Sequence, residues 1–315
     1  MYDSHIFDYL RTHNLVLCMI SILIPTYNYT AYPLASTLAR QAQNTNIPCE
    51  IIVADDASTS DECKRQNQSI SSLPLCTYIE LENNIGRASI RNLLADKAKG
   101  EWLLFLDCDG LPVDNHFLAR YTQAINTFPQ AHIICGGIVH PESLPSPNQS
   151  LRYLYEKDAE KHHTATKRNE RPYASFRTFN FMIRRESFQQ VRFDQTFRHY
   201  GYEDVLFGIQ LRQRGFHIHH IDNPLENQDI EPNDIFLKKT EEALRTLAEQ
   251  AEKLGESVHI HHLYTKLSHM GVLPLVRALF HLSAPMLRSN LTGKHPFLTY
   301  FAFYKLGYYT SIKKK

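Results

Sequence analysis

Two closely spaced acidic residues, Asp107 and Asp109, follow a run of five apolar residues, Trp102–Leu106. Two carboxylates in a tight turn offer the hard oxygen ligands that Mg²⁺ and Mn²⁺ prefer, and they leave room for phosphate oxygens on the same cation. A D-x-D sequence alone is also compatible with a solvated turn. Its position at the end of an apolar strand favours a divalent-cation site that binds a phosphorylated substrate.

A second acidic pair, Glu203 and Asp204, precedes a segment with helical periodicity, Val205–Arg214. The helix macrodipole favours acidic side chains at this position, so helix capping is one interpretation of the pair. Capping does not explain the aromatic, glycine-containing sequence that leads into it, Phe197–Tyr202. A catalytic role for the carboxylates is the second interpretation, and His199 beside them is a further candidate for the site.

The elements that must position these acids alternate between short apolar runs and amphipathic segments. We predict strands at 21–24, 50–54, 76–81, 102–106 and 133–139, with helices at 32–43, 90–99 and 115–128. This order is typical of an α/β fold with a mostly parallel sheet. Polar residues gather where the strands stop, at 26–28, 55–56 and 107–109. Ligands of open α/β sheets bind at the carboxyl ends of strands, so we expect the active site at this edge.

The remaining segments depart from this alternation. Residues 141–172 combine prolines with a long polar run and few apolar anchors, so we predict a mobile loop or lid there. We predict an amphipathic helix at 236–254 and basic helical sequence from residue 263. The expected parts are an N-terminal extension at 1–18, an α/β domain at 19–230 and a helical region at 231–315.

Four segments resemble family-2 glycosyltransferases in their order and spacing. They are S-I-L-I-P-T-Y-N (Ser21–Asn28), E-I-I-V-A-D-D-A-S (Glu50–Ser58), N-N-I-G-R-A-S-I-R-N (Asn83–Asn92) and G-E-W-L-L-F-L-D-C-D (Gly100–Asp109). The resemblance implies the GT-A fold and the transfer of a sugar, with inversion, from a nucleotide diphosphate donor. We favour a UDP-sugar as that donor.

The resemblance also implies roles for the matched positions. The loop that wraps the nucleoside is matched by Pro25, Thr26 and Asn28, and the pair of which one residue contacts the base by Asp55 and Asp56. The segment that flanks the nucleotide is matched by Asn84, Gly86, Arg91 and Asn92. The D-x-D that holds the ribose and the metal–diphosphate is matched by Asp107 and Asp109. The implied cofactor is a divalent cation, Mn²⁺ or Mg²⁺. From the residues alone, a simple turn remains an alternative for the acidic pair after the second strand, and a surface ion pair for the arginine.

The segment Gly201–Asp204 resembles the G-x-E-D element of chondroitin-polymerase-like and galactosyltransferase-like members of this family. By that resemblance Asp204 is the general base on the acceptor hydroxyl, and Glu203 orients the acceptor. A single carboxylate base with in-line attack is consistent with inversion. Asn180 resembles a position on a strand that lines the acceptor side.

One segment departs from the family pattern. Many relatives have a metal-binding histidine in an N-P-x-x-H segment, whereas this chain has Asn227 at the histidine position. Either Asn227 or Glu226 replaces that ligand, or the cation rests on the D-x-D and the diphosphate alone. His217, His219 and His220 form a nearby cluster, for which we favour ordinary strand polarity over a metal site.

The net charge of the chain is +1, from 34 basic and 33 acidic residues among 315. All 33 acids and 26 of the basic residues precede Val258, which gives −7 before that residue and +8 after it. The acidic larger part argues against a nucleic-acid binder. The near-neutral total therefore combines an acidic body with a basic C-terminal part.

The basic C-terminal part contains aromatic residues at helical spacing: Phe297, Tyr300, Phe301, Tyr304 and Tyr308, with Lys313–Lys315 beyond. Such a helix is typical of peripheral contact with anionic lipid, and the inner membrane is the expected surface. The alternative is a helix packed on the catalytic domain with a solvated lysine tail. If the helix meets lipid, a lipid-linked or lipopolysaccharide-type acceptor follows.

The cysteines and the apolar runs bear on location. Six cysteines without metal-ligand spacing favour reduced thiols and a cytoplasmic protein. Leu15–Pro25 resembles the apolar part of a signal peptide but lacks a basic start and a cleavage site, so we interpret it as a first strand.

From the motifs and the family resemblance together, we predict an inverting glycosyltransferase of surface polysaccharide or lipopolysaccharide-type biosynthesis. A sugar-1-phosphate nucleotidyltransferase and a non-catalytic carbohydrate- or membrane-binding module are the alternatives.

Overall fold

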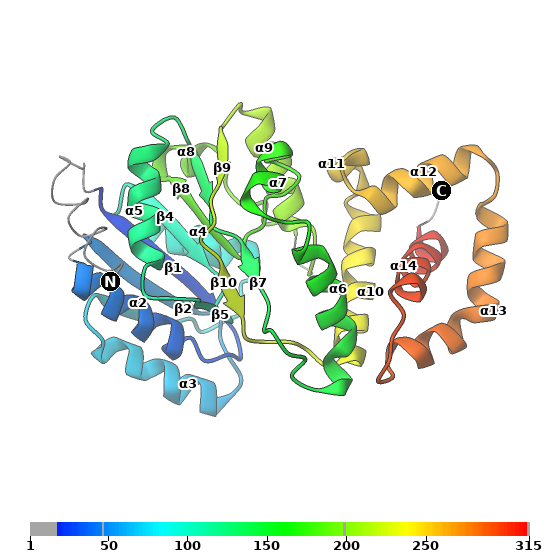
Figure 1. The fold of residues 1–315 in the computed structure, drawn as a ribbon, viewed down its shortest axis with the longest axis horizontal. Coiled ribbons are helices and arrows are strands. Elements are labelled where there is room, and N and C mark those ends of the chain that lie inside the picture. The colour runs from blue at the N-terminus through cyan, green and yellow to red at the C-terminus, as the bar shows by residue number, and fades with distance from the viewer. Residues whose placement is uncertain (1–17, 46, 198–199, 314–315) are drawn as a thin grey trace.

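The computed structural model describes residues 18–45, 47–197 and 200–313, with a seven-stranded sheet at the centre (Figure 1). In spatial order its strands are β3 (Cys76–Glu80), β2 (Cys49–Asp55), β1 (Ile20–Thr26), β4 (Trp102–Leu106), β8 (Asn180–Arg184), β6 (Ile133–Cys135) and β9 (Ile218–His220). The first four are parallel, and β8 is antiparallel to both β4 and β6. The predicted mostly parallel sheet is present, with one reversed strand. All but the last residue of the expected extension at 1–18, and also His199, lie outside the described residues.

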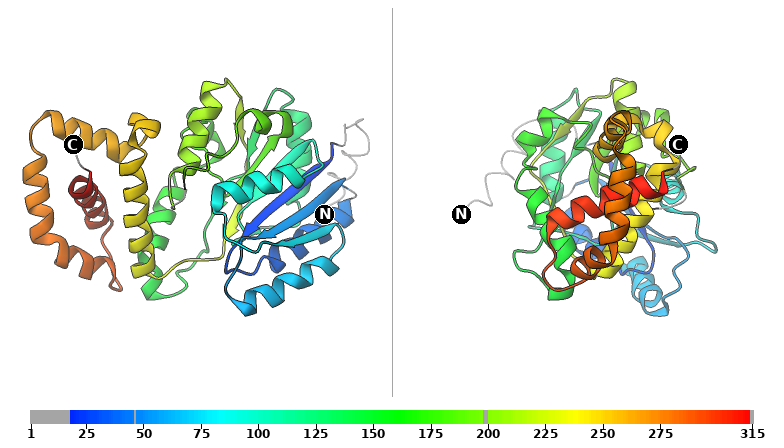
Figure 2. Two further views of the ribbon diagram at one scale, coloured as in Figure 1. Left: turned by 180° about the vertical axis from the view of Figure 1, so that it is seen from behind. Right: turned by 90° about the vertical axis from the view of Figure 1, so that its right-hand side faces the viewer.

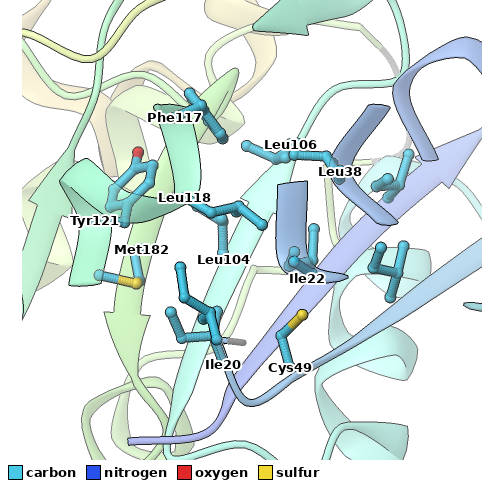
Figure 3. Packing of buried hydrophobic residues seen from close by; sticks show 14 of the residues in the cluster. Ile20, Ile22, Leu38, Cys49, Leu104, Leu106, Phe117, Leu118, Tyr121 and Met182 are labelled. Carbon is cyan, nitrogen blue, oxygen red and sulfur yellow. The ribbon is translucent and has the colours of Figure 1, made fainter. Parts of the chain in front are cut away.

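Helices cover both faces of this sheet because its central strands are apolar on both sides. One face buries Ile22 and Leu104 against α2 (Tyr32–Thr45) and α5 (Phe117–Thr127), as Figure 3 shows. The other face buries Leu23 and Phe105. It is covered by α4 (Arg87–Lys97), α8 (Arg185–Gln190) and α9 (Glu203–Gln213). This double cover fixes the strand ends, from which the polar loops project.

The predicted strand at 133–139 is divided in two. After β6 the chain turns at Gly136 and Gly137 and continues as β7 (Ile138–Val139) in a second sheet. Gly137 has a φ of +100°, and a Cβ there would lie 2.7 Å from the guanidinium of Arg168. The second sheet has the order β5 (Gly110–Pro112), β10 (Leu225–Asn227), β7. It extends the carboxyl edge of the large sheet at the point where the D-x-D turn ends.

The prediction of a mobile loop or lid at 141–172 is wrong. This segment forms η2 (Pro147–Gln149), α6 (Ser150–Glu160) and α7 (Ala165–Glu170). Leu151 is fully buried in a cluster with residues of the C-terminal helices, and Arg168 is buried against β9. The polar side chains of this segment bond to one another and to distant backbone, so few apolar anchors are enough to order it.

The C-terminal region is entirely helical among its described residues. Its elements are α10 (Asn233–Glu249), α11 (Ala251–Leu254), η3 (Gly255–Ser257), α12 (His259–His269), α13 (Leu273–Leu291) and α14 (Leu298–Ile312). Elsewhere in the chain, α3 (Asp61–Gln68) and η1 (Ser69–Ser72) link β2 to β3. Figures 1 and 2 show α14 between α10 and α13, with α13 at the end of the molecule. The predicted helices at 236–254 and from 263 correspond to α10 to α14.

The aromatic residues of α14 divide between two environments. Tyr304 is buried against Phe280, and Phe301 is buried against Tyr155 and Phe236, as expected for a packed helix. Tyr300, and Phe297 just before the helix, are exposed. The aromatic face of α14 is therefore largely a protein contact and not a free lipid-facing stripe. Within the described residues, no helix is by itself long and apolar enough to cross a membrane. The bent pair α12 and α13, with 119° between its halves, meets that length and composition together.

Candidate active site

The D-x-D turn joins β4 to β5 at the carboxyl edge of the sheet. The backbone N–H of Asp107 donates to the carbonyl of Phe179 at 3.0 Å, and the N–H of Gly110 donates to the carbonyl of Asp107 at 3.2 Å. The first bond ties the turn to the residue before β8, and the second closes the turn on itself. About a quarter of the Asp107 side chain (24%) is exposed, so its carboxylate is open to a ligand.

Arg91, from α4, anchors the first carboxylate of this turn. Its Nη2 donates to Oδ1 of Asp107 at 2.7 Å, and its side chain is only 3% exposed. The guanidinium also lies over the ring of Phe193, 5.5 Å from the centroid. The arginine is therefore in a buried ion pair and not a surface one. Breaking such a pair would leave a charge without its partner in a medium that solvates it poorly.

Asp109 is the more perturbed of the two carboxylates. Burial, and after it the negative charge of Asp107, raise its pKa to about 7, and the charge of Arg152 opposes this rise. Two carboxylates held in one turn repel each other, and a divalent cation between them would remove that cost. Among the described residues no group of three or more His, Cys, Asp or Glu is placed to hold a metal. Two carboxylates in one turn would leave coordination positions of a cation open to substrate phosphates.

Asn227 lies next to this turn through the small sheet. It pairs with Gly110 across the antiparallel β5–β10 ladder, and the N–H of Gln228 donates to the carbonyl of Asp109 at 2.8 Å. The Asn227 side chain is fully buried, and its Oδ1 accepts from the N–H of Asp229 at 3.0 Å. Its Nδ2 has no hydrogen-bond partner among the described residues. The residue is thus beside the D-x-D turn. Its Nδ2 can still donate a hydrogen bond, whereas only its Oδ1 could contact a cation. Its neighbour Glu226 hydrogen-bonds Gln228.

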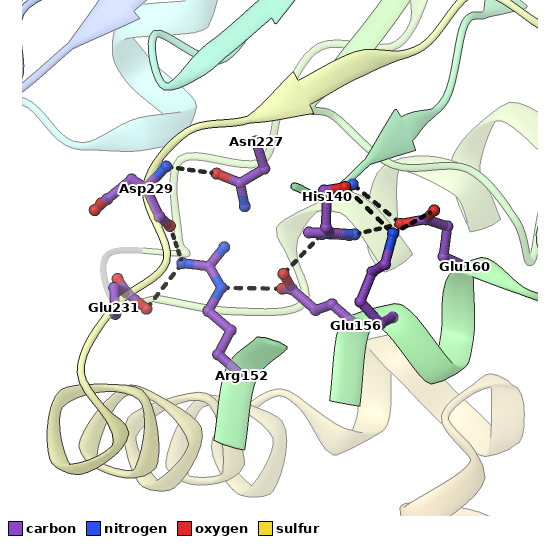
Figure 4. A network of polar contacts seen from close by, with 8 residues as sticks. His140, Arg152, Glu156, Glu160, Asn227, Asp229 and Glu231 are labelled. Carbon is purple, nitrogen blue, oxygen red and sulfur yellow. Dashed lines mark hydrogen bonds and ion pairs between the residues drawn. The ribbon is translucent and has the colours of Figure 1, made fainter. Parts of the chain in front are cut away.

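Arg152 of α6 brings a positive charge close to the D-x-D turn that its sequence context did not indicate. It lies in the polar network of Figure 4. Its Nη1 contacts the carbonyl of Asp229 and a carboxylate oxygen of Glu231, each at 3.0 Å, and its Nε donates to Glu156 at 3.0 Å. Its charge lowers the pKa of Asp109. The polar run around it concealed this residue, because only the tertiary fold brings α6 beside the segment after β10.

The polar network extends from Arg152 through Glu156 to a buried histidine, His140. His140 lies between Glu156, at 2.8 Å, and Glu160, at 3.0 Å. Burial alone would lower the pKa of His140, but the bonds and charges of the two glutamates outweigh burial and raise it. The result is an ordered chain of alternating charges, which fixes α6 and with it the guanidinium of Arg152.

The loops after β1 and β2 are tied to each other by the predicted nucleoside residues. Thr26 follows Pro25 at the end of β1, and its hydroxyl donates to the carbonyl of Tyr29 at 2.8 Å. Asn28 has a φ of +51°, and its Oδ1 accepts from the N–H groups of Thr59, at 2.7 Å, and Ser60, at 3.0 Å. Asn28 thus links the two loops and gives them one shape.

The acidic pair after β2 is buried and engaged within the protein. Asp55 accepts from the Ser58 N–H at 2.7 Å and from the Tyr78 hydroxyl at 2.9 Å. Asp56 accepts from the N–H groups of Ile85, at 2.7 Å, and Gly86, at 2.9 Å. The side chain of Asn84 donates to the Asp56 carbonyl at 3.0 Å. These residues shape the loop after β2 through contacts within the protein. Asn92 likewise bonds the backbone of Phe193.

The second acidic pair begins α9 and faces α4. Oε1 of Glu203 is 3.7 Å from Nη1 of Arg87, and Oδ2 of Asp204 is 3.9 Å from Nε of Arg177. Burial, the largest effect, raises the pKa of Asp204, and Arg177 opposes that rise. Arg87 and Arg91 are one helical turn apart, so α4 contacts both acidic motifs. The fold therefore brings together the D-x-D and E-D motifs that lie almost a hundred residues apart in sequence.

Gly201 sets the path of the chain into this pair. Its φ is +108°, and a Cβ there would lie 2.6 Å from the Cβ of Ala243 in α10. We expect Gly201→Ala to destabilise the fold by about 3 kcal/mol, because strain and a steric clash add together, and to lower any activity that depends on Asp204. Gly215 is the matched control, since its φ is +70° but a Cβ there meets nothing within 4 Å. Its alanine variant should lose about 1 kcal/mol. Thermal unfolding compares the two, and equal losses would contradict this account of Gly201.

Other polar candidates of the sequence are engaged in the fold. His220 is buried, with its ring nitrogens 3.1 Å from Nη1 of Arg168 and 2.9 Å from the carbonyl of Pro172. His219 stacks on Phe128. Asn180 bonds the Tyr121 hydroxyl at 2.6 Å and two backbone carbonyls. The favoured interpretation of the histidines as strand polarity agrees with these contacts, and Asn180 has a structural function.

Comparison with known proteins supplies the context of this site. The family model described as "Glycosyl transferase family 2" matches residues 21–192. A curated relative, the chondroitin synthase of Pasteurella multocida, is 24% identical over 296 residues, which are 82% of this chain and 29% of the synthase. The curated relatives are matched over 29 to 53% of their own length.

Two solved structures share the fold. Staphylococcus aureus TarS in complex with UDP has a TM-score of 0.52 and 18% identity, over 94% of this chain and 90% of that chain. A mannosyltransferase of Pyrobaculum calidifontis, in complex with GDP-Man and Mn²⁺, has a TM-score of 0.54 and 14% identity, over 98% and 91%. These likenesses confirm the expected GT-A fold.

Proposed function

This chain belongs to glycosyl transferase family 2 and is a glycosyltransferase, and we propose that it transfers one sugar, with inversion, from a nucleotide diphosphate donor to a glycan hydroxyl. Membership of this family replaces the two alternative functions, a sugar-1-phosphate nucleotidyltransferase and a non-catalytic binding module. A UDP-sugar is the favoured donor. The similar structures were solved with UDP in one case and GDP-Man in the other, so both nucleotides belong in the test.

One observation carries the proposal: α4 connects the two acidic motifs. Arg91 pairs with Asp107 at 2.7 Å, and one turn earlier Arg87 lies 3.7 Å from Glu203. A donor diphosphate at the D-x-D turn and an acceptor at the E-D pair would therefore lie on the same side of this helix. Arg87 and Arg152 add positive charge around the turn, which would stabilise the charge of the departing nucleoside diphosphate.

A divalent cation, Mn²⁺ or Mg²⁺, is part of the proposal. Asp107 and Asp109 would hold it, with the amide oxygen of Asn227 on the neighbouring strand as the third protein group, through the lone pair that the N–H of Asp229 leaves free. When bound, such a cation offsets the negative charge of a leaving diphosphate. The raised pKa of Asp109 supports this, since its causes are the burial of the carboxylate and the negative charge of Asp107 beside it, and a cation would offset both. The similar mannosyltransferase was solved with Mn²⁺.

On the acceptor side, Asp204 is the proposed general base and Glu203 the residue that orients the acceptor. Both acids lie in the first turn of α9, where the helix dipole favours the ionised form, as Arg177 does for Asp204. The base takes the proton of the acceptor hydroxyl while that oxygen attacks the anomeric carbon. The bond to the diphosphate breaks on the opposite face of the sugar, so the configuration inverts.

The proposed setting is the synthesis of a surface polysaccharide or lipopolysaccharide-type glycan, with a glycan or lipid-linked acceptor. The similarity to a chondroitin synthase supports a glycan acceptor. A cytoplasmic location, at the inner face of a membrane, completes the proposal. The six cysteines, all of them free, are consistent with a reducing compartment.

The test is thermal unfolding of the protein with UDP-sugars and GDP-sugars, each with and without Mn²⁺. A ligand at one hundred times its Kd raises stability by about 2.7 kcal/mol through mass action, so the true donor gives the largest shift. We expect one nucleotide class to raise Tm by several degrees and Mn²⁺ to enlarge that rise. If no nucleotide sugar shifted Tm under either condition, the donor proposal would be wrong.

A further inference from the structure

The outward side of α13 is an exposed apolar face. Leu275, Leu279, Leu282 and Met286 follow spacings of four, three and four residues, which place them on one side of the helix. Their exposed fractions are 61, 49, 83 and 57%. Pro274, Ala278 and Pro285 are exposed with them. We call this set the α13 face.

The opposite side of α13 accounts for the packing of the helix. Phe280, Leu287 and Leu291 are buried against Phe301 and Tyr304 of α14. A surface helix normally turns its charged residues outward once its inner stripe is buried. Here the outward side is apolar for about three turns, and an exposed patch of that kind marks an interaction surface.

The shape of the C-terminal region leaves this face accessible. Figures 1 and 2 show α13 at the end of the molecule, on the far side of α14 from the sheet domain. Its axis is bent by 119° from that of α12, and the two helices together are as apolar as a membrane segment. Neither helix by itself is both long and apolar enough to span a membrane. A helix with these properties fits the interface between water and lipid better than the bilayer interior.

The charges around the face favour an anionic surface. Between Val258 and Lys313 there is no acidic residue, and the basic ones are Lys266, Arg277, Arg288, Lys294, Lys305 and Lys313. Lys266 and Lys294 are exposed, beyond the two ends of α13. The exposed aromatic side chains of Phe297 and Tyr300 follow Lys294 in sequence. Apolar side chains with cations and aromatic rings nearby are suited to an anionic lipid headgroup layer.

We propose that the α13 face docks on an anionic membrane, with Leu279 and Leu282 inserted at the headgroup boundary. This inference deepens the proposed function and rests on it for the identity of the acceptor. The sheet domain lies beyond α14 and α10 from the docked face, so the reacting sugar must stand away from the lipid surface. The acceptor class that fits is a membrane-attached glycan that extends from its anchor.

The test measures co-flotation of the full chain with vesicles of phosphatidylcholine alone or mixed with phosphatidylglycerol. We expect binding to the mixed vesicles that weakens with salt, and little binding to phosphatidylcholine. Leu282→Glu should weaken binding at least about tenfold. The change removes a leucine that the lipid would bury, and it adds a negative charge next to the anionic headgroups. Leu75→Glu, at a leucine that is 46% exposed before β3, is the matched control and should bind as the parent protein does.

Two further measurements keep the outcomes distinct. Transfer to a water-soluble acceptor should be unchanged in Leu282→Glu, because the face is remote from the catalytic residues, so a failed proposed function would appear as no transfer by any variant. Light scattering reports a dimer: if Leu282→Glu dissolved a dimer of the parent chain, the face would belong to a second copy. That result, or equal flotation of Leu282→Glu and the parent, would overturn the membrane proposal.

Discussion

Replacement of Asp204 by asparagine is expected to lower kcat by about 10³-fold while donor binding stays unchanged. Asparagine keeps the size of the side chain but cannot take a proton from the acceptor hydroxyl. The D-x-D turn and its Arg91 anchor are untouched by the change, so Tm shifts with the nucleotide sugar should match those of the parent protein. Steady-state transfer rates, measured with the donor identified by thermal unfolding, give the result.

A structural function for Asp204 would give a different pattern. Asp234 has the equivalent place at the start of α10, as the second residue of its helix after an N1 asparagine. If Asp204 only stabilised its helix, Asp204→Asn and Asp234→Asn would both lower Tm slightly and neither would stop transfer. Full activity in Asp204→Asn would remove it as the base.

The pH dependence of transfer gives a second readout of the same residue. Burial raises the pKa of Asp204, and Glu203 adds to the rise against the opposing charge of Arg177. A base works only when ionised, so activity is lost as pH falls through this raised pKa. The acid limb of the kcat/KM profile should therefore lie at a higher pH than for an ordinary aspartate, and it should be missing from Asp204→Asn.

The sequence allowed prediction of the elements whose signal is local. Apolar runs such as Trp102–Leu106 must be strands buried on both faces, and the acids that follow them must lie at the sheet edge. The family resemblance implied that Arg91 flanks the nucleotide, and the structure places this arginine in an ion pair with Asp107. These strands and the positions of the acids that follow them depend on residues close together in sequence, so a single sequence is enough to predict them.

The parts that could not be predicted depend on contacts between distant residues. Arg152 reaches the site only because Glu156, Glu231 and the backbone of Asp229 hold it, and those partners come from two segments about eighty residues apart. A polar run with few apolar residues reads as a loop until such partners are known. The burial of the α14 aromatics by α13 was hidden for the same reason.

Replacement of Asp109 by asparagine should have two effects of opposite sign. In the absence of metal and donor the protein should become more stable, by about 1–2 kcal/mol, because a buried carboxylate that is repelled by Asp107 is replaced by a neutral amide. Functional sites often hold such unfavourable charge, and removing it stabilises the fold. For a chain of this size the expected rise in Tm is about 2–4 °C.

The same change should remove the effect of the cation. With one carboxylate left, the turn loses a hard oxygen ligand, so Mn²⁺ should no longer enlarge the Tm shift given by the nucleotide sugar, and transfer should fall by about 10²-fold or more. Asp114→Asn is a suitable control, since Asp114 is an exposed partner of Arg120 near the same edge and should cost stability rather than add it. A lower Tm for metal-free Asp109→Asn, or a Mn²⁺ effect equal to that of the parent protein, would show that the two carboxylates do not share a cation. Asp109→Asn should therefore raise the stability of the metal-free protein and lower transfer. Both effects have one cause, because the repulsion between the two carboxylates destabilises the metal-free fold and favours binding of a cation.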